Sequence, residues 1–294
     1  ARVRGSDRAP EITADWSLHN GSLRLDDPTL AAFERLEFAG SFTEQQLQLS
    51  SCHGELGSAP FVASGWVDLS KETPEVDVQL DGTDLLLYRR EGVKVRSDAA
   101  LKIRGPLDAL RVEGEATLTD GRYTKPVDFI LPLLRRGQPP TGNVEGISLF
   151  SLAPPLDTMK LDLKVKPGNG FRIKTNVANG MIRPDLRLTG TGEIPYLIGE
   201  IYFDQTILNM PAHRITLEQG VIRFGEENPF VPTLDLRAGF RRYGYDVTIL
   251  VEGDVTDPII TMSSVPPLSP EELLLFTTTG QPPQENANAQ EALG

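Results

Sequence analysis

The sequence predicts an all-β protein built on a long, curled, antiparallel-rich sheet with one or two short helices. Apolar and charged residues alternate again and again, most regularly between 159 and 261, as in the run Lys160-Leu161-Asp162-Leu163-Lys164-Val165-Lys166. The 23 prolines and 27 glycines punctuate short runs and form no low-complexity tract, which is typical of a chain with many strands. Segments that could form helices to cover such a sheet are nearly absent.

The alternation predicts a sheet with one apolar face and one charged face. Successive strand side chains point to opposite faces, so Leu161, Leu163 and Val165 share one face and the intervening charged residues share the other. Exposed aliphatic surface costs roughly 25 cal/mol per Å², so the apolar face must be covered. Two arrangements remain open on the residues alone: two sheets pressed into a sandwich, or one sheet folded over into an open trough with an apolar lumen.

In the N-terminal half the predicted strands are short. They centre on Trp16 and Leu18, Leu23 and Leu25, Leu36 and Phe38, Leu47 and Leu49, Val76 to Leu80, and Leu101 and Ile103. Four Asx-Gly dipeptides predict tight hairpin turns, because they accept positive φ angles: Asn20-Gly21, Asp81-Gly82, Asp120-Gly121 and Asn179-Gly180. The segment Thr83–Arg90 predicts a short helical turn.

The C-terminal half alternates more cleanly. Its predicted strands centre on Leu161 to Val165, Phe171 and Ile173, Leu186 and Leu188, Ile201 and Phe203, Ile215 and Leu217, Ile222 and Phe224, Leu234 to Ala238, and Tyr245 to Val251. Ser269, Pro270 and Glu272 form a capping-box signature before an apolar run, so a helix is expected to begin there. A glycine pair spaced by nine residues, 105 and 114, recurs at 190 and 199 and suggests a hairpin repeated along one axis.

Composition divides the chain into five parts. The composition becomes typical of a loop between residues 137 and 156, where Pro139-Pro140 and Pro154-Pro155 occur. We therefore expect an N-terminal segment of the sheet over 1–136, an irregular loop or boundary over 137–156, a C-terminal segment of the sheet over 157–265, a short helix over 266–280 and a polar, disordered tail over 281–294. The mid-pattern start and polar end lead us to expect a fragment of a longer protein.

Charge and cysteine content exclude several classes of protein. With 29 basic and 41 acidic residues the net charge is -12, and no basic run offers a footprint for nucleic acid. The single cysteine, Cys52, cannot form an internal disulfide and is expected to be a small buried thiol. No stretch approaches the roughly 20 apolar residues of a membrane-spanning helix, and the N-terminal residues lack the apolar region of a signal peptide.

No catalytic residues, metal ligands or cofactor motifs are predicted. His19, His53 and His213 lie far apart and lack a second ligand at metal-binding spacing. The carboxylates of the charged phase, such as Asp162 and Glu200, are expected to be solvated charges. A carbohydrate-active β-solenoid stays open as an alternative, because it needs only paired carboxylates roughly 5 to 10 Å apart, one of them with a raised pKa.

A series of motifs toward the C terminus carries a family resemblance. In order they are Gly199-Glu200-Ile201-Tyr202-Phe203, Gly220-Val221-Ile222-Arg223-Phe224, Pro232-Thr233-Leu234-Asp235-Leu236-Arg237-Ala238, Val247-Thr248-Ile249-Leu250-Val251-Glu252-Gly253, Asp257-Pro258, Ser263-Ser264 and the run from Pro266 to Leu274. Their order and spacing resemble the TamB C-terminal domain of the AsmA-like bridge protein family over residues 188–275. From residue 1 to about 158 the likeness is only that of short strands ending in glycine.

The resemblance implies a β-taco, a long curled sheet with a hydrophobic lumen. It implies the periplasmic portion of a protein of the Gram-negative cell envelope that is anchored in the inner membrane and reaches the outer membrane. Members of this family are thought to pass phospholipid between the two membranes, and the TamA protein of outer-membrane β-barrel assembly is a partner. The chain departs from a complete member in two ways: it lacks the N-terminal membrane helix, and it stops shortly after the Ser269 helix.

The expected function is to conduct phospholipid acyl chains between inner and outer membranes through a hydrophobic groove, without cofactor or covalent chemistry. An apolar trough suits acyl chains because it demands no hydrogen-bond partners. The alternative is a scaffold or chaperone for outer-membrane β-barrel assembly that acts through sheet edges with a TamA-type or BamA-type partner. The residues expected to line the groove are Leu161, Leu163, Val165, Phe171, Ile173, Leu186, Leu188, Ile201, Phe203, Leu234, Leu236, Val247 and Ile249.

Overall fold

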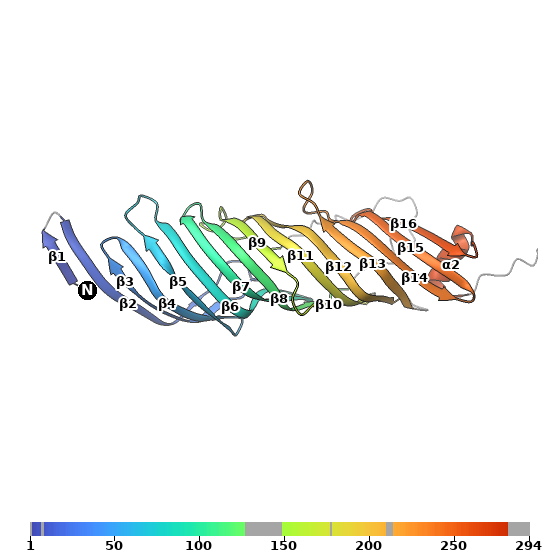
Figure 1. Cartoon of the computed structure of the whole chain (residues 1–294), viewed down its shortest axis with the longest axis horizontal. Coiled ribbons are helices and arrows are strands. Elements are labelled where there is room, and N and C mark those ends of the chain that lie inside the picture. The colour runs from blue at the N-terminus through green and yellow to red at the C-terminus, as the bar shows by residue number, and fades with distance from the viewer. Residues whose placement is uncertain (1, 7–8, 127–148, 177, 210–213, 282–294) are drawn as a thin grey trace, which may run out of the picture.

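A computed structural model describes residues 2–6, 9–126, 149–176, 178–209 and 214–281. Within them the chain forms one 16-stranded, mixed but mostly antiparallel sheet and a single short helix, which confirms the predicted all-β class. The sheet is elongated, and its strands run obliquely to its long axis (Figure 1). No helix in these ranges has the length and hydropathy needed to cross a bilayer.

The strands follow one another along the sheet nearly in chain order. They are β1 Arg2–Ser6, β2 Ala9–Leu23, β3 Phe33–Thr43, β4 Gln46–Leu56, β5 Ala59–Asp68, β6 Glu75–Arg90, β7 Val93–Pro106, β8 Arg111–Tyr123, β9 Lys160–Lys166, β10 Phe171–Lys174, β11 Ala178–Thr191, β12 Pro195–Asn209, β13 Arg214–Phe224, β14 Thr233–Arg242, β15 Tyr245–Asp254 and β16 Ile259–Val265; the helix is α2, Pro270–Thr279.

One crossover interrupts the antiparallel order. Strands β9 and β10 lie one after the other between β8 and β11, and both pair with β8 in parallel and with β11 antiparallel. The chain therefore leaves β8 at one long edge of the sheet and returns at the opposite edge to begin β9. The expected pattern of hairpins alone did not include this crossover.

The returning segment shows how strongly the sheet is curled. The backbone N–H of Ser151 donates to Oδ2 of Asp27 in the β2–β3 loop at 2.9 Å, and the next N–H, of Leu152, donates to the carbonyl of Gly192 in the β11–β12 loop at 2.8 Å. Following the strand directions through the sheet places these two loops at opposite long edges. Two adjacent residues contact both, so the edges approach each other and the sheet is curved rather than flat.

The Asx-Gly dipeptides are not turns, and this prediction was wrong. All four lie inside strands: Asn20-Gly21 in β2, Asp81-Gly82 in β6, Asp120-Gly121 in β8 and Asn179-Gly180 in β11. Three of the glycines adjoin shifts in strand register, at Gly21, Gly82 and Gly180, where the strand bends. Gly121 is needed for space, because a Cβ there would lie 2.1 Å from the Phe171 ring.

The observed tight turns use other residues. Gly57 and Ser58 join β4 to β5 with φ of 60° and 66°, and Tyr243 and Gly244 join β14 to β15 with φ of 50° and 82°. The expected helical turn over Thr83–Arg90 is likewise wrong: these residues are the second half of β6. After a register shift at Gly82 their pairing with β7 resumes, and Leu85 packs into the core with 1% exposure.

The capping box is confirmed. Ser269 Oγ accepts from the N–H of Glu272 at 3.4 Å, while the Ser269 N–H donates to Glu272 Oε2 at 2.9 Å. Pro270 begins α2, and Gly280 ends it with φ of 67°. Of the expected chain divisions, most of the 137–156 boundary and nearly all of the 281–294 tail lie outside the described residues.

The two copies of the predicted glycine repeat are structurally equivalent. Gly105 and Gly114 flank the β7–β8 hairpin and Gly190 and Gly199 flank the β11–β12 hairpin, all four with φ between 97° and 147°. A Cβ would lie 2.1 Å from the Ala100 carbonyl oxygen at Gly114 and 2.3 Å from that of Asp185 at Gly199. The repeat thus marks where neighbouring backbones approach too closely for a side chain.

We expect Gly199→Ala to destabilise the protein by about 1–3 kcal/mol, because alanine is strained at this positive φ and its methyl group meets the Asp185 carbonyl. Gly225→Ala is the matched control, since nothing lies within 4 Å of a Cβ there. Urea unfolding of both variants measures the difference. Equal midpoints for the two would contradict the close approach.

Candidate functional site

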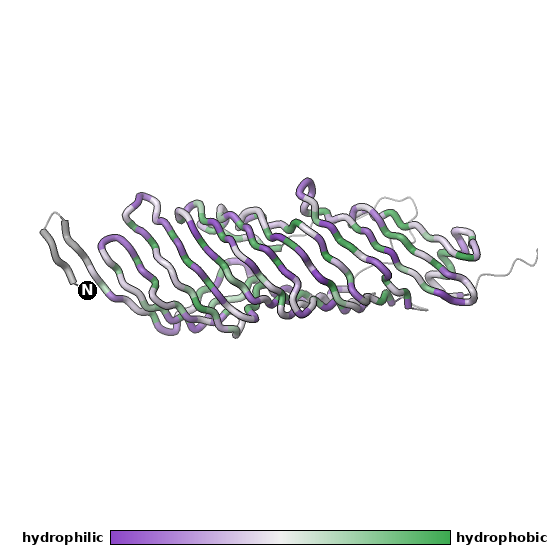
Figure 2. Tube along the Cα trace, in the orientation of Figure 1, coloured by the Kyte–Doolittle hydropathy of each residue, from purple (hydrophilic) through white to green (hydrophobic). Residues whose placement is uncertain are grey.

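The candidate site is the apolar face of the sheet. Cross-strand pairing aligns its side chains in rows that pass through many strands; one row consists of Leu80, Leu101, Gly114, Leu163 and Leu188. Hydrophobic and hydrophilic residues alternate accordingly along the coloured strands of Figure 2. Because directly paired residues point to the same side, we define the apolar face as the side that carries this row.

All thirteen residues expected to line a groove lie on the apolar face. The pairing that places them there includes Val165 with Leu186, Leu163 with Leu188, Phe171 and Phe203 with Ile182, Ile201 and Leu234 with Ile222, Leu236 with Val251, and Ile249 with Ala238. Leu161, Leu186, Val247 and Ile249 are buried, and the other nine are partly exposed. Their role as lining stays a prediction.

The N-terminal strands extend the same face, which the expected lining set did not include. A second cluster packs around the buried residues Leu36, Cys52, Leu56, Ala59, Phe61, Leu85 and Ala99. Pairing of Phe38 with Cys52, and of Cys52 with Ala63, continues the apolar rows toward β2. In the sequence, the alternation of apolar residues around Leu36 and Leu47 indicates this part of the face. Register shifts within these strands interrupt the alternation and make it harder to recognise.

Cys52 belongs to this face as a structural side chain. Burial raises the pKa of its thiol to about 11, so the thiol stays protonated near neutral pH. The side chain is buried and forms no disulfide. The expectation of a small buried thiol is confirmed.

Helix α2 covers the apolar face at its C-terminal end. Phe276 has 0% exposure and packs over Val247, also at 0%. The Phe276 ring lies 5.3 Å from that of Phe240 and 6.0 Å from that of Tyr245, measured between centroids. Leu273 completes the contact. At this end the face is therefore sealed by the chain itself.

The opposite face carries charged side chains that pair across strands. Arg187 of β11 donates two hydrogen bonds of 2.6 Å to the Asp162 carboxylate of β9. Arg223 joins Glu200 at 2.9 Å and Asp235 at 3.3 Å. We call this side the polar face; its ion pairs link neighbouring strands and keep the sheet's outer side hydrated.

These carboxylates do not have the electrostatics of a glycosidase. The hydrogen bonds from Arg187 lower the pKa of Asp162, and those from Tyr202 and Arg223 lower the pKa of Glu200. A general acid needs the opposite shift. The described residues also contain no group of three or more side chains able to hold a metal ion.

Acidification should weaken the sheet through Asp162. Because its folded-state pKa is lowered, the ion pair stabilises the fold above the usual carboxyl pKa of about 4, and this stabilisation is lost as the pH falls below that value. Urea midpoints at about pH 6 and about pH 3 should therefore differ less in Asp162→Asn than in the parent protein. Asp185→Asn is the control, because Asp185 is an exposed carboxylate of the same face. If the difference between the two midpoints were the same in both variants, the stabilising ion pair could not be assigned to Asp162.

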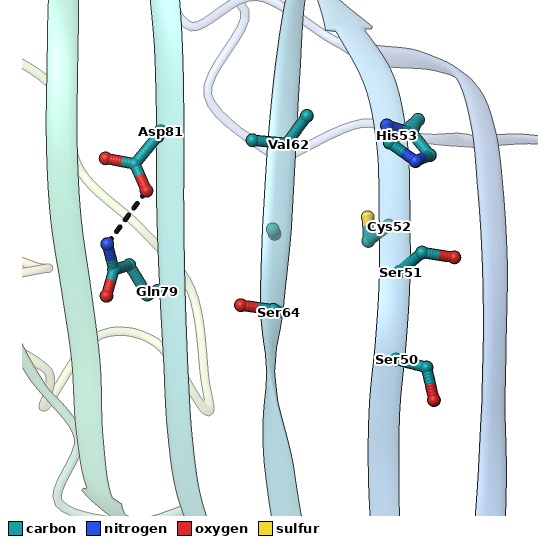
Figure 3. A pocket seen from close by; sticks show the side chains of 9 residues that line it. Ser50, Ser51, Cys52, His53, Val62, Ser64, Gln79 and Asp81 are labelled. Atoms are coloured by element: carbon teal, nitrogen blue, oxygen red, sulfur yellow. Dashed lines mark hydrogen bonds between the residues drawn. The ribbon is translucent and has the colours of Figure 1, made fainter.

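A shallow pocket lies where β4 shifts register against β5 (Figure 3). Its lining residues are Ser50, Ser51, Cys52, His53, Val62, Ala63, Ser64, Gln79 and Asp81. The hydrogen bond of 2.9 Å between Gln79 Nε2 and Asp81 Oδ2 spans two residues of β6, and β5 separates both from His53. Small side chains at the register shift explain the hollow without a catalytic role.

Comparison with known proteins identifies the family of this extended sheet. The TamB C-terminal domain matches residues 56–294, well beyond the 188–275 over which the resemblance was seen. This is a structural and transport family of the Gram-negative cell envelope, associated with the translocation and assembly module, and not an enzyme family. Searches of curated proteins and of solved structures gave no match. Since the match covers most of the chain, the protein belongs to the TamB family.

Proposed function

We propose that this chain is part of a periplasm-spanning bridge whose apolar face forms a groove that conducts phospholipid acyl chains between the inner and outer membranes. One observation supports it above the others: cross-strand pairing continues the apolar face, strand by strand, from β2 to β16, and α2 covers the C-terminal end of that face. In the full-length protein an inner-membrane anchor would hold one end of the bridge.

The chemistry of the face suits this cargo. Aliphatic and aromatic side chains offer dispersion contacts and dehydration, and an acyl chain needs no hydrogen bonds in return. Nine of the thirteen expected lining residues are partly exposed, although Phe203, Leu234 and Leu236 among them also pack against the buried cluster under α2. The paired charges of the polar face keep the outer surface of the curled sheet hydrated.

Photo-crosslinking tests the proposal. A photoreactive residue at Leu188 is expected to give phospholipid adducts in cells, and one at Thr189 is not. The two positions are neighbours in β11 that face opposite sides of the sheet, and both are partly exposed. Native mass spectrometry of the purified chain should find co-purified phospholipid. Equal labelling at the two positions would refute an acyl-chain groove.

A second candidate function is the scaffold for outer-membrane β-barrel assembly, with a TamA-type partner. The observation that favours it is the edge strand β16, which pairs with β15 alone among the described strands. Its sequence IITMSSV contains no charge and no proline, the residues that usually protect an edge against pairing. Val265, 73% exposed, is the position to label: peptide adducts there, with none of lipid at Leu188, would favour the scaffold.

A further inference from the structure

Four cations stand opposite one another across four neighbouring strands. Arg89 of β6 pairs with Lys94 of β7, Lys94 pairs with Arg122 of β8, and Arg122 pairs with Arg172 of β10. Neighbouring strands are about 4.8 Å apart, so the four positions span only about 15 Å. We call these four residues the cationic row. In β10 the row residue Arg172 alternates with Phe171 and Ile173, so it lies on the polar face.

The cationic row is electrostatically unfavourable by itself, because like charges directly opposite each other on adjacent strands destabilise a sheet. Within the described chain only Lys94 has an acidic partner, Asp120 at 3.1 Å. Arg89, Arg122 and Arg172 are exposed and form no ion pair with any described residue. By contrast, Arg183, Arg187 and Arg223 elsewhere on the polar face each contact a carboxylate.

The row lies at one long edge of the sheet. It is within two residues of the β6–β7 turn, the end of β8 and the end of β10. Arg90, Lys125 and Lys174 add three further cations at the same edge, against two carboxylates, Glu91 in the turn and Asp27 of the β2–β3 loop near Arg90. A protein of net charge -12 thus concentrates unpaired positive charge at one stretch of one edge.

Directly behind the row lies the apolar face. Phe171 and Ile173 are on that face on either side of Arg172, and Val95 is there beside Lys94. An amphiphile whose hydrocarbon tail lay on these residues would bring its polar end to this edge. The long stems of arginine and lysine can pack along apolar surface while their charged ends reach round to a headgroup.

We propose that this edge binds the phosphate group of an anionic phospholipid whose acyl chain lies on the adjoining apolar face. The proposal rests on the proposed function and names the headgroup that the groove selects. Guanidinium groups bind phosphate oxygens through paired hydrogen bonds, and charge-assisted bonds of this kind are among the stronger ones in proteins. The bound phosphate also relieves the repulsion within the cationic row.

Lipid selectivity tests the proposal. The purified chain is incubated with phosphatidylcholine vesicles that contain phosphatidylglycerol, and the lipid it takes up is measured by mass spectrometry. We expect phosphatidylglycerol to be enriched over its share in the vesicles by about tenfold, the effect of one charge-assisted hydrogen bond. Arg122→Gln with Arg172→Gln should abolish the enrichment and leave the total acyl-chain uptake unchanged.

The control is Lys102→Gln with Lys160→Gln. It removes two exposed lysines that likewise form no ion pair in the described chain but lie away from the cationic row, since Lys102 is eight residues along β7 from Lys94 and Lys160 begins β9 at the opposite edge; the net charge changes equally. This variant should keep the enrichment. If the phosphatidylglycerol enrichment were lost in both double variants, the overall charge of the protein and not this edge would select the lipid, and the proposal would be overturned.

Other outcomes separate this proposal from the acyl-chain groove. Uptake in vesicle proportions by the parent protein would overturn the headgroup site and leave the groove standing. No uptake of either lipid would overturn both. If inorganic phosphate binds the lipid-free chain and abolishes the enrichment at millimolar concentration, the edge is a site for free anions; if an acidic peptide does so instead, it is a protein-docking surface. Either result would replace the headgroup assignment.

Discussion

Replacing Phe276 with alanine should cost about 3–5 kcal/mol of stability at the C-terminal end of the sheet. The side chain is fully buried and contacts three aromatic rings, those of Phe240, Tyr243 and Tyr245. Alanine would leave a cavity over Val247 that the paired strands cannot close, because their spacing is set by backbone hydrogen bonds. The loss should be seen as early urea unfolding and as faster hydrogen exchange in β14, β15 and β16.

Two other substitutions in the same helix serve as comparisons for Phe276→Ala. Leu275→Ala removes a side chain that is 52% exposed and should change stability by no more than about 0.5 kcal/mol. Thr277→Val should raise stability by about 1 kcal/mol, because the buried Thr277 hydroxyl has no hydrogen-bond partner in the described structure and valine has nearly the same shape. A Phe276→Ala protein no less stable than Leu275→Ala would show that α2 does not pack on the sheet.

Features encoded within a few residues were predictable from the sequence. The capping box at Ser269 and Glu272 is such a feature, since its hydrogen bonds join residues three apart. Alternation over 160–166 likewise predicted both the strand and its buried side. The same local reasoning failed for Asp81-Gly82 and its three counterparts. A turn and a bend within a strand both need glycine, and only the pairing of the neighbouring strand distinguishes them.

Features that depend on register between distant segments could not be predicted. Arg122 and Arg172 are fifty residues apart, and nothing in either local sequence indicates that they pair. The chain returns parallel to β8 in β9 and then in β10, and the pairing of β10 with β8 creates that contact. The thirteen apolar residues were easier to group, because alternation assigns a face to each strand and the sheet then aligns those faces.

A charge placed on the apolar face should block lipid transfer. Phe203 is half-buried on this face in β12, where it pairs with Ile182. An arginine there would place a charge among apolar side chains, on the route that the proposed function gives to an acyl chain. Inserting such a charge into a hydrocarbon environment costs about 3 kcal/mol, which corresponds to a rate lower by about a hundredfold. We expect Phe203→Arg to reduce transfer between donor and acceptor vesicles by at least about tenfold.

Tyr202→Arg is the matched control, because it introduces the same side chain one residue away on the polar face. The new charge stands opposite Arg183 of β11, so some stability is lost, but Glu200 lies beside this position and solvent reaches the polar face. Transfer should stay close to the parent rate. Circular dichroism and a urea midpoint establish that both variants are folded. If folded Phe203→Arg transfers lipid as fast as Tyr202→Arg does, acyl chains do not travel over β12, and the groove cannot be the route.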